Sequence, residues 1–278
     1  MVRRVLIGIA LALAARAQSS LPFEPYHDAG ESITGAFEGW FPNADGTFSM
    51  LLGYYNRNLA QTIDIAIGPN NRIEPGPPDQ GQPTHFLPAR QWGVFTITVP
   101  KDFGEKKLHW TLVSNGKTTV IPISLHPMYE VQPFTDASGN TPPFIAFSDS
   151  GPFVQGPRGQ SRELSTTVSS PLALPLWLAD DAKSTLSIPR LMSTPVTVTW
   201  SKFRGPGAVT FSNDRPPVVK AEFKPPPPAV FSGTAATTAK FSEPGEYILR
   251  VVANDASGDG GRGFQCCWSN AQVKVAVK

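Results

Sequence analysis

The sequence has few cysteines and few histidines, and their scarcity argues against a zinc site. Only two cysteines and four histidines occur in 278 residues, and the histidines show neither an HExxH motif nor paired spacing. The usual pattern of a Cys/His zinc site is therefore missing. The sequence also lacks a GxSxG nucleophile elbow and a P-loop, and its glycine-rich stretch from Gly258 to Gly263 leads into Phe-Gln-Cys-Cys, not into a helix whose N-terminus could hold phosphate. We therefore expect a protein that is not an enzyme and needs no cofactor.

Long apolar runs are also missing, except at the N-terminus. Arg3 and Arg4 precede an apolar run from Val5 to Ala15, and Ala15-Arg16-Ala17 has the small residues of a signal peptidase site. The run has about eleven residues, roughly half of the ~20 that a transmembrane helix needs. This order predicts a signal peptide over residues 1–17, with an uncleaved anchor as the alternative. We expect a periplasmic or extracellular bacterial protein with no stable membrane span after cleavage.

Charge of one sign does not dominate the sequence. The chain has 24 Lys and Arg residues against 22 Asp and Glu, a net charge of +2. Removing residues 1–17 takes away three arginines and no acid, which leaves 21 basic against 22 acidic residues, a net charge of −1. Nucleic-acid binding requires a basic surface, so we expect no nucleic-acid partner.

Helical periodicity is nearly absent after the signal peptide, because proline or glycine interrupts almost every window. With 29 prolines and 24 glycines among frequent β-branched and aromatic residues, the composition predicts an all-β fold of short strands joined by turns. Strands are predicted at residues 32–41, 47–56, 62–67, 94–99, 107–113, 118–124, 144–147, 165–178, 196–202, 208–212, 237–241, 245–253 and 270–277.

The strands group into two halves, separated by a stretch rich in Pro, Gly and Ser over residues 132–160. The strands in residues 31–125 suit one antiparallel sandwich or barrel. We therefore predict two tandem antiparallel β-sandwich modules, over residues 18–135 and 136–278. The first is assigned to no family beyond a general immunoglobulin-like or jelly-roll-like sandwich.

The second half carries a series of recognisable strand motifs. The run Val196 to Trp200 alternates in hydropathy, and the stretch from Phe241 through Pro244-Gly245 and Tyr247 leads to Asn254-Asp255. Over residues 140–278 or so, the chain resembles PKD-type immunoglobulin-like domains. The resemblance implies a two-sheet sandwich, and the alternation places Trp200 between the sheets. The module is longer than a usual PKD domain, because it carries a Pro-rich excursion at residues 215–229 and a Gly-rich one at 257–263.

The two cysteines, Cys266 and Cys267, are adjacent and precede Trp268. In an oxidising compartment they can pair only with each other or with another molecule. A disulfide between neighbours closes an eight-membered ring and staples no long loop, so it adds little stability through chain entropy. Three interpretations stay open: an inert pair packed beside Trp268, a rigid exposed vicinal disulfide in a binding loop, and a metal or redox role.

Calcium is the metal for which the sequence offers the most candidate ligands, whereas for copper it offers only His126 and Met128. Asp180, Asp181, Asp255 and Asp259 fall near predicted turns, where carboxylates can converge on Ca²⁺. No EF-hand spacing is present, and aspartates also favour turns for local hydrogen bonding. A calcium site at these residues and a purely local role are both open.

Aromatic residues cluster in the first half of the chain. Alternation places Phe37 and Phe41 on the opposite side of their strand from Trp40. One set of these aromatics belongs to the core. The other set either is exposed and stacks on sugar rings or a partner protein, or is buried as well. The candidate ligand-binding aromatics are Trp40, Tyr54, Tyr55, Trp92 and Trp268.

These features predict an exported, non-catalytic binding or adhesion accessory protein that recognises a polysaccharide or another exported protein. The alternative is a structural spacer or subunit of a cell-surface assembly. A metal-binding protein or an enzyme is the third hypothesis.

Overall fold

The computed structural model describes residues 27–183, 194–255 and 266–278. The predicted signal peptide lies outside these residues. Apart from the short 3₁₀ helix η1 (Pro127–Tyr129), the regular elements of the described chain are β-strands, which confirms the all-β fold class. The described residues contain no helix with the length and apolar character to cross a bilayer.

The first module contains two three-stranded sheets and a small two-stranded one. Its centre is apolar, with Phe86, Trp110 and Ile123 fully buried. In sheet order, the strands are β1 (Ile33–Pro42), β2 (Phe48–Asn56) and β6 (Ala89–Val99); β4 (Asn71–Glu74), β7 (Lys107–Ser114) and β8 (Lys117–Ser124); and β3 (Ile63–Asp64) with β5 (His85–Phe86).

The second module is a β-sandwich of two sheets. One sheet has the order β10 (Gln160–Thr166), β17 (Trp268–Val277), β16 (Gly245–Asp255) and β12 (Val196–Arg204). The other has the order β13 (Val209–Phe211), β15 (Phe231–Phe241), β11 (Leu172–Asp180) and β9 (Phe144–Ala146), and β14 (Val219–Lys220) also pairs with β15.

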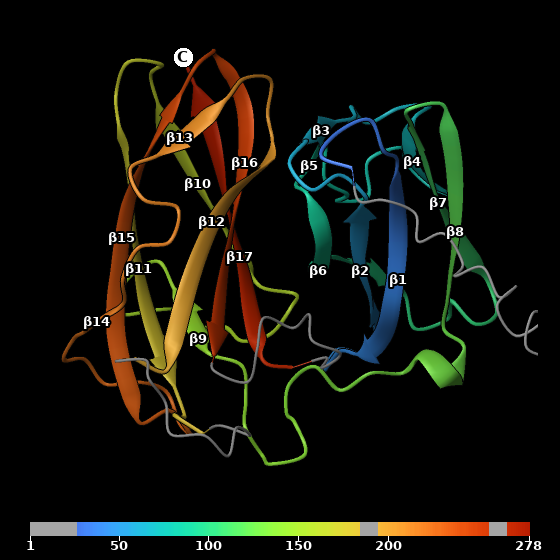
Figure 1. The fold of residues 1–278 in the computed structure, drawn as a ribbon. Helices are drawn as coiled ribbons and strands as arrows, with labels where there is room; N and C mark the ends of the chain where they lie inside the picture. Colours follow the sequence, from blue (N-terminus) through green and yellow to red (C-terminus); the bar gives the residue numbers. More distant parts are fainter. Residues whose placement is uncertain (1–26, 184–193, 256–265) are drawn as a thin grey trace, which may run out of the picture.

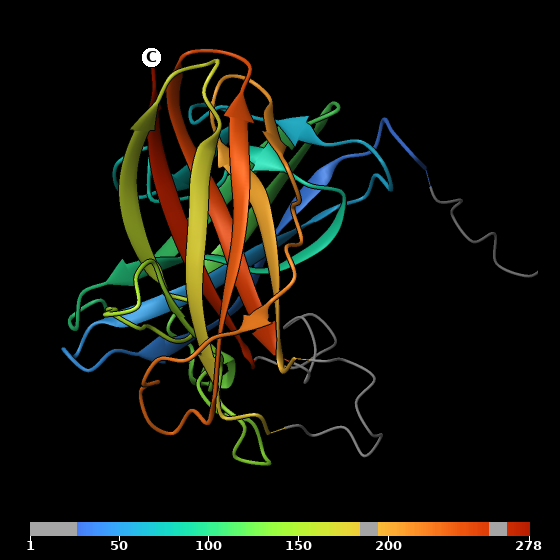
Figure 2. The same ribbon diagram turned by 90° about the vertical axis from the view of Figure 1, so that its left-hand side faces the viewer.

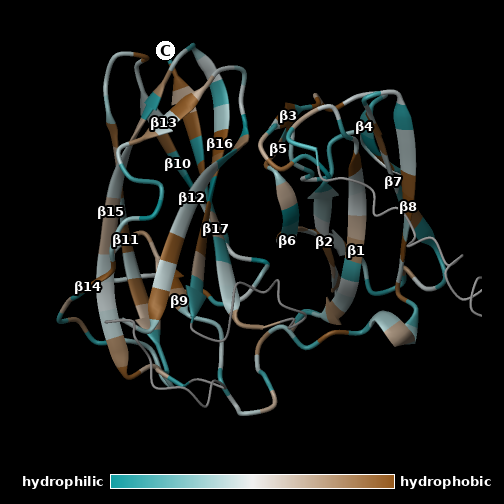
Figure 3. Cartoon of the chain, viewed as in Figure 1, coloured by the Kyte–Doolittle hydropathy of each residue, from teal (hydrophilic) through white to brown (hydrophobic). Residues whose placement is uncertain are grey.

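Alternation along the strands builds the core of the second module. Val196, Val198 and Trp200 of β12 point between the two sheets and are buried, as the sequence predicts for Trp200. Figure 3 shows the corresponding alternation of hydropathy along β12. The outer face of the same strand carries Thr197, Thr199 and Ser201.

The predicted strands agree with the structure in position more often than in length. The Asn115-Gly116 hairpin forms as expected, with both residues at positive φ between β7 and β8. The strand predicted at residues 165–178 is instead two strands, β10 and β11, because the chain turns at residues 167–170 and crosses to the other sheet. Since β10 runs parallel to β17, the prediction of purely antiparallel sheets is wrong for this pair.

The two modules lie side by side rather than end to end (Figure 1). Turned by 90°, the strands of the first module cross behind those of the second at an oblique angle (Figure 2). The connection between them runs from the end of β8 at Ser124 to the start of β9 at Phe144. This packing brings the outer face of β12, β16 and β17 against β5 and β6.

Candidate functional site: a cleft between the modules

One part of the boundary between the modules is closed by the end of β12. Phe203 lies in the hydrophobic core of the first module and is 3% exposed. Its carbonyl accepts a hydrogen bond from the Thr84 N–H at 3.2 Å. The next residue, Arg204, donates to both carboxylate oxygens of Asp79, at 2.7 and 2.8 Å, and to the Gln82 carbonyl. We call this group of contacts the closed boundary.

A second set of contacts joins β16 and β17 to β6. Arg250 and Asn270 both donate to the carbonyl of Gly93, at 3.1 and 2.7 Å. The Trp268 ring packs directly on Gly93, where an added Cβ would lie 2.1 Å from Trp268 Cζ2. Gly93 also has a φ of +51°, so both its backbone and its neighbour favour glycine there.

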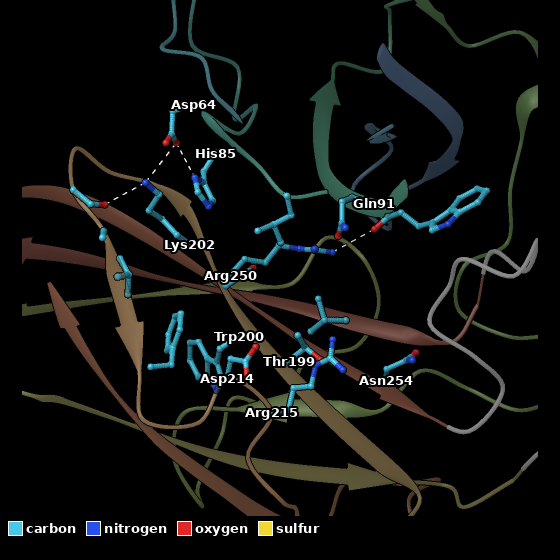
Figure 4. A pocket seen from close by; sticks show the side chains of 18 of the residues that line it. Asp64, His85, Gln91, Thr199, Trp200, Lys202, Asp214, Arg215, Arg250 and Asn254 are labelled. Carbon is cyan, nitrogen blue, oxygen red and sulfur yellow. Dashed lines mark hydrogen bonds and ion pairs between the residues drawn. The ribbon is translucent and has the colours of Figure 1, made fainter. Parts of the chain in front are cut away.

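Between and beside these contacts, the boundary opens into a cleft of about 850 Å³, which we call the inter-module cleft. One wall consists of Gln91 and Trp92 of β6, and the other of Thr199 and Ser201 of β12 together with Arg250 of β16. Figure 4 shows Arg250 extending from β16 toward the first module, with Thr199 and Asn254 on the second-module wall. Volumes of roughly 300–1,000 Å³ are usual for ligand sites.

Three charged or titratable groups meet at one end of the cleft. Asp64 Oδ1 lies 2.7 Å from His85 Nδ1 and 3.4 Å from Lys202 Nζ (Figure 4). Partial burial alone would raise the pKa of Asp64, but the hydrogen bond and charge of His85, together with Lys202, outweigh it and hold the pKa below its usual value. This end is therefore internally neutralised.

Arg90, Trp92 and Glu38 form a second charged group at the first-module wall. The Arg90 guanidinium stacks over the Trp92 ring, with its central carbon 3.8 Å from the ring centroid. Glu38 accepts from Arg90 Nη2 at 2.6 Å and from the Gly93 N–H at 2.7 Å. Burial of Glu38 raises its pKa above the usual value despite these donors.

Arg250 is the buried cation of the cleft. It is 7% exposed, and its Nε and Nη2 donate to Asn270 Oδ1 and to the Gly93 carbonyl, all neutral acceptors. Among the described residues, no carboxylate lies within 4 Å of it, and Nη1 makes no hydrogen bond. Burial lowers the pKa of Arg250 to about 10, so the side chain is charged at neutral pH.

Buried polar atoms of the lining residues also lack partners. Trp200 Nε1, Trp268 Nε1 and Asn254 Oδ1 make no hydrogen bond within the described part of the chain. Buried polar atoms are normally hydrogen-bonded, so each of these three is unusual. Trp200 Nε1 lies in the core between the sheets of the second module and Trp268 Nε1 lies beside Gly93, so only Asn254 belongs to the face that is turned toward the cleft.

The predicted ligand-binding aromatics divide into two sets. Trp40 and Tyr54 are buried, and their polar atoms bond inside the module: Trp40 Nε1 donates to the His126 carbonyl, and Tyr54 Oη accepts from the Leu87 N–H. They cannot stack on a ligand from solvent. Tyr55 is 36% exposed but does not line the cleft. Trp92 and Trp268, from different modules, both line it, but Trp268 is 2% exposed with its ring packed on Gly93, so only Trp92 has ring surface open to a ligand.

The two faces of β1 are both covered. A β-bulge between Phe37 and Gly39 interrupts the alternation that the sequence suggests. Trp40 joins the core, whereas Phe41 and Phe37 contact Phe134 and Tyr129 in the segment after β8, at 5.3 and 5.5 Å between ring centroids. An exposed aromatic row on this strand is therefore ruled out.

Cys266 and Cys267 form a disulfide with each other. Both are buried, at 3% and 0% exposure, and their sulfurs lie near the Asn140 carbonyl. The interpretation of an exposed knuckle is thus wrong, because the segment around Asn140 covers the pair. The pair directly precedes Trp268, as the inert packing interpretation expects.

The calcium hypothesis finds no site in the described residues, which contain no group of three or more metal-ligating side chains. Asp181 accepts from the N–H and hydroxyl of Thr141, and Asp255 accepts from Asn140 Nδ2. Asp180 accepts from the Ala182 N–H. The Asp180 bond is local, as is common for turn aspartates, whereas Asp181 and Asp255 bind the segment at Asn140 and Thr141, which is distant in the sequence. Asp259 lies outside the described residues.

Sequence reasoning did not single out Arg250, Ser201 or Lys202. One signal was available for Arg250, which interrupts the otherwise apolar run from Tyr247 to Ala253. Alternation places it on the face away from the sandwich core, together with Ile248 and Val252. Apolar residues on an outer face indicate that something covers the face, which here is the first module.

No protein-family model matches the chain, and no curated protein sequence matches it. Among solved structures, the chain is similar to the N-terminal domain of PorA, at 11% identity and a TM-score of 0.28, over 49% of this chain and 97% of that one. It is also similar to dimeric latent PorU from Porphyromonas gingivalis, at 9% identity and a TM-score of 0.27, over 88% of this chain and 24% of that one. It is similar as well to the D0-D1 domain of intimin, at 11% identity and a TM-score of 0.24, over 88% of this chain and 97% of that one. These likenesses concern β-sandwich construction alone.

Proposed function

We propose that this protein is an exported, non-catalytic binding protein that holds a polysaccharide in the inter-module cleft. The observation that carries the proposal is the composition of the cleft walls. The half-buried Trp92 lines the same cleft as the hydroxyl and amide side chains of Thr199, Ser201 and Asn254. A saccharide offers an apolar ring face that can stack on Trp92, and hydroxyl groups that can bond to the hydroxyl and amide side chains.

The non-catalytic part of the proposal rests on the geometry of the titratable groups. His85 Nδ1 is bound to Asp64, and within the described chain its other ring nitrogen makes no hydrogen bond to a serine, threonine or cysteine. A nucleophile paired with a base is therefore not assembled in the cleft. Lys202 is paired with Asp64 and with the Gly207 carbonyl.

The arrangement of the modules favours binding over the role of a spacer. A spacer gains length when its modules follow each other end to end, whereas here they lie side by side (Figure 1). The contacts of Phe203, Arg204 and Arg250 hold the two walls of the cleft at a fixed separation. Preorganised walls reduce the entropic cost of binding.

We further propose that the second module is of PKD type. The Pro244-Gly245 turn leads into β16, and Tyr247 Oη donates to the Glu243 carbonyl while it accepts from the Gly207 N–H. A tyrosine that bonds backward to the chain before its strand is a recurring device of immunoglobulin-like sandwiches. Export to the bacterial periplasm or exterior is proposed from the N-terminal residues.

The test is a thermal-shift screen of the protein against neutral and acidic polysaccharides. A ligand that binds only the folded state, at about 100 times its dissociation constant, stabilises it by about 2.7 kcal/mol, which raises the Tm by roughly 5 °C or more. We expect Trp92→Ala to lose the shift and Tyr55→Ala, an exposed aromatic outside the cleft, to retain it. If no polysaccharide raises the Tm, or if Tyr55→Ala loses the shift and Trp92→Ala does not, the proposal is wrong.

A further inference from the structure

The inference concerns Arg250 and deepens the proposed function on which it rests. A buried charge is costly unless a counter-charge or a full set of hydrogen bonds compensates it. Arg250 has only neutral acceptors, and its Nη1 is left over at a cleft wall. The protein thus keeps one strong donor unused beside an open space.

The charged groups around Arg250 do not supply the missing anion. Glu38 on the facing module is bound to Arg90 and to the Gly93 N–H. Asp64 is engaged by His85 and Lys202 at the other end of the cleft. Asp214 and Glu243 also line the cleft, and both are exposed residues that make no ion pair with Arg250. The Arg90, Glu38 and Arg250 group therefore carries a net positive charge.

Hydroxyl and amide groups surround this charge on the same wall. Ser201 lies directly opposite Arg250 in the ladder of β12 and β16, and Thr199 is opposite Val252. Asn254, two residues beyond Val252 on the same face, leaves its Oδ1 as an unpaired acceptor. Arg250 and Asn254 lie four residues apart on β16, about 13 Å along the strand, so an anion and hydroxyl donors are needed at two points of an extended ligand. A chain of sugar units that bear carboxylates provides both.

We propose that the inter-module cleft binds an acidic polysaccharide built from uronic acid units, with a carboxylate of the ligand on Arg250 Nη1 and a sugar ring beside Trp92. An arginine N–H and a carboxylate form a charge-assisted hydrogen bond, the stronger kind in proteins. A neutral polysaccharide leaves the buried guanidinium uncompensated and binds more weakly.

The experiment compares two ligands that share a sugar backbone and differ in whether each carboxylate is free or methyl-esterified. Oligogalacturonates and their fully methyl-esterified forms are titrated into the protein by calorimetry, and mannuronate and glucuronate oligomers extend the series. We expect at least one acidic oligomer to bind, and the matched esterified ligand to bind about tenfold more weakly or worse. Added salt should weaken the binding of the acidic ligand and leave the affinity for the ester nearly unchanged.

Ser201 allows a test that leaves Arg250 in place. Residues directly opposite in an antiparallel pair have side chains within about 5 Å of each other. Ser201→Glu therefore places an internal carboxylate beside Arg250, and Ser201→Gln is its neutral match. We expect Ser201→Glu to lose about tenfold or more in affinity for the acidic ligand, with no fall in Tm. Ser201→Gln also replaces a cleft hydroxyl, so it should weaken the acidic oligomer and its ester by a similar factor, whereas Ser201→Glu should weaken the acidic oligomer selectively.

The outcomes separate this inference from the proposed function. Equal binding of acidic and esterified oligomers, or unchanged acidic binding by Ser201→Glu, overturns the inference while polysaccharide binding stands. If no saccharide binds and a Glu-rich peptide does, both the inference and the proposed function fail. A loss of acidic binding in Ser201→Glu that exceeds its loss of ester binding, while Ser201→Gln changes both alike and both variants are folded, supports a carboxylate on Arg250.

Discussion

The closed boundary and the inter-module cleft are two parts of one surface, and they treat buried charge differently. At the closed boundary, Arg204 has a carboxylate partner in Asp79, and Phe203 fills a place in the core of the neighbouring module. In the cleft, Arg250 has no such partner among the described residues, and Asn254 Oδ1 on the same strand is unpaired. One part joins the modules, and the other leaves a buried charge without a counter-charge.

This difference teaches that the two parts should respond oppositely to mutation. Changes at the closed boundary should lower stability, because the contacts there are already made in the free protein. Changes in the cleft should leave stability nearly unaltered and alter binding, since binding sites commonly sit on surfaces that a rigid scaffold holds in position. The stability predictions below rank from the largest effect to the smallest.

The largest effect is expected for Phe203→Ala. Truncation of a buried phenylalanine costs about 3–5 kcal/mol through lost burial and the cavity left behind. Urea denaturation followed by tryptophan fluorescence should show this loss. Phe211, a half-buried residue at the cleft wall, is the matched control, and Phe211→Ala should cost clearly less. Equal costs for the two variants would remove the distinction between the closed boundary and the cleft.

Gly93→Ala should follow, at about 2–3 kcal/mol, because it combines an unfavourable backbone with crowding against Trp268. Gly46→Ala separates these causes. Gly46 has a φ of +82°, and no atom lies within 4 Å of the position of an added Cβ, so only the backbone cost of about 1 kcal/mol applies. Unfolding by urea measures both variants. If they are equally destabilised, the Trp268 contact contributes nothing.

The sequence predicts the inside of each module better than the boundary between them. Alternation identifies the core positions of β12 because burial of one face is a local, period-two property of the strand. The turn at Asn115-Gly116 is equally local. The outer face of β16 mixes polar and apolar residues, and this local pattern does not show what covers the face. The covering strand is β6, more than 150 positions away in the chain.

The cleft was recognised in part, through Trp92 and Trp268. Their selection followed from residue type alone, and Trp40 and Tyr54, chosen by the same reasoning, proved to be buried. Exposure of an aromatic on a strand depends on which other segment covers it. For Trp40 and its neighbours, that segment follows β8, and no local pattern announces it. Arg250 was missed because its significance also depends on tertiary packing. Only the folded structure shows that the first module buries Arg250 and that no described carboxylate lies beside it.

Asp79→Asn should reduce stability by at most about 1 kcal/mol at neutral pH, since the Asp79 side chain is 56% exposed and solvent screens the pair. Its hydrogen bonds with Arg204 hold the pKa of Asp79 below the ordinary value of 3.8, against the effect of partial burial. A lowered folded-state pKa gives stability that is present above pH 3.8 and lost as the pH falls through the folded-state value. The difference between variant and parent should therefore vanish in acid. Urea titrations across this range test it, and a constant difference at every pH would contradict the assigned cause.

Reduction of the Cys266–Cys267 disulfide should give the smallest effect. Closing a loop between neighbours restricts the unfolded chain little, so the bond should contribute about 1 kcal/mol or less, against about 3 for a fifteen-residue loop. Because both cysteines are buried, the reduced sample is prepared by unfolding and refolding in reductant, and thiol titration verifies its state. Unfolding by urea then compares the two forms. A loss near 3 kcal/mol would mean that the bond holds Trp268 against Gly93 and belongs with the contacts that join the modules, whereas a small loss leaves that task to Arg250 and Asn270.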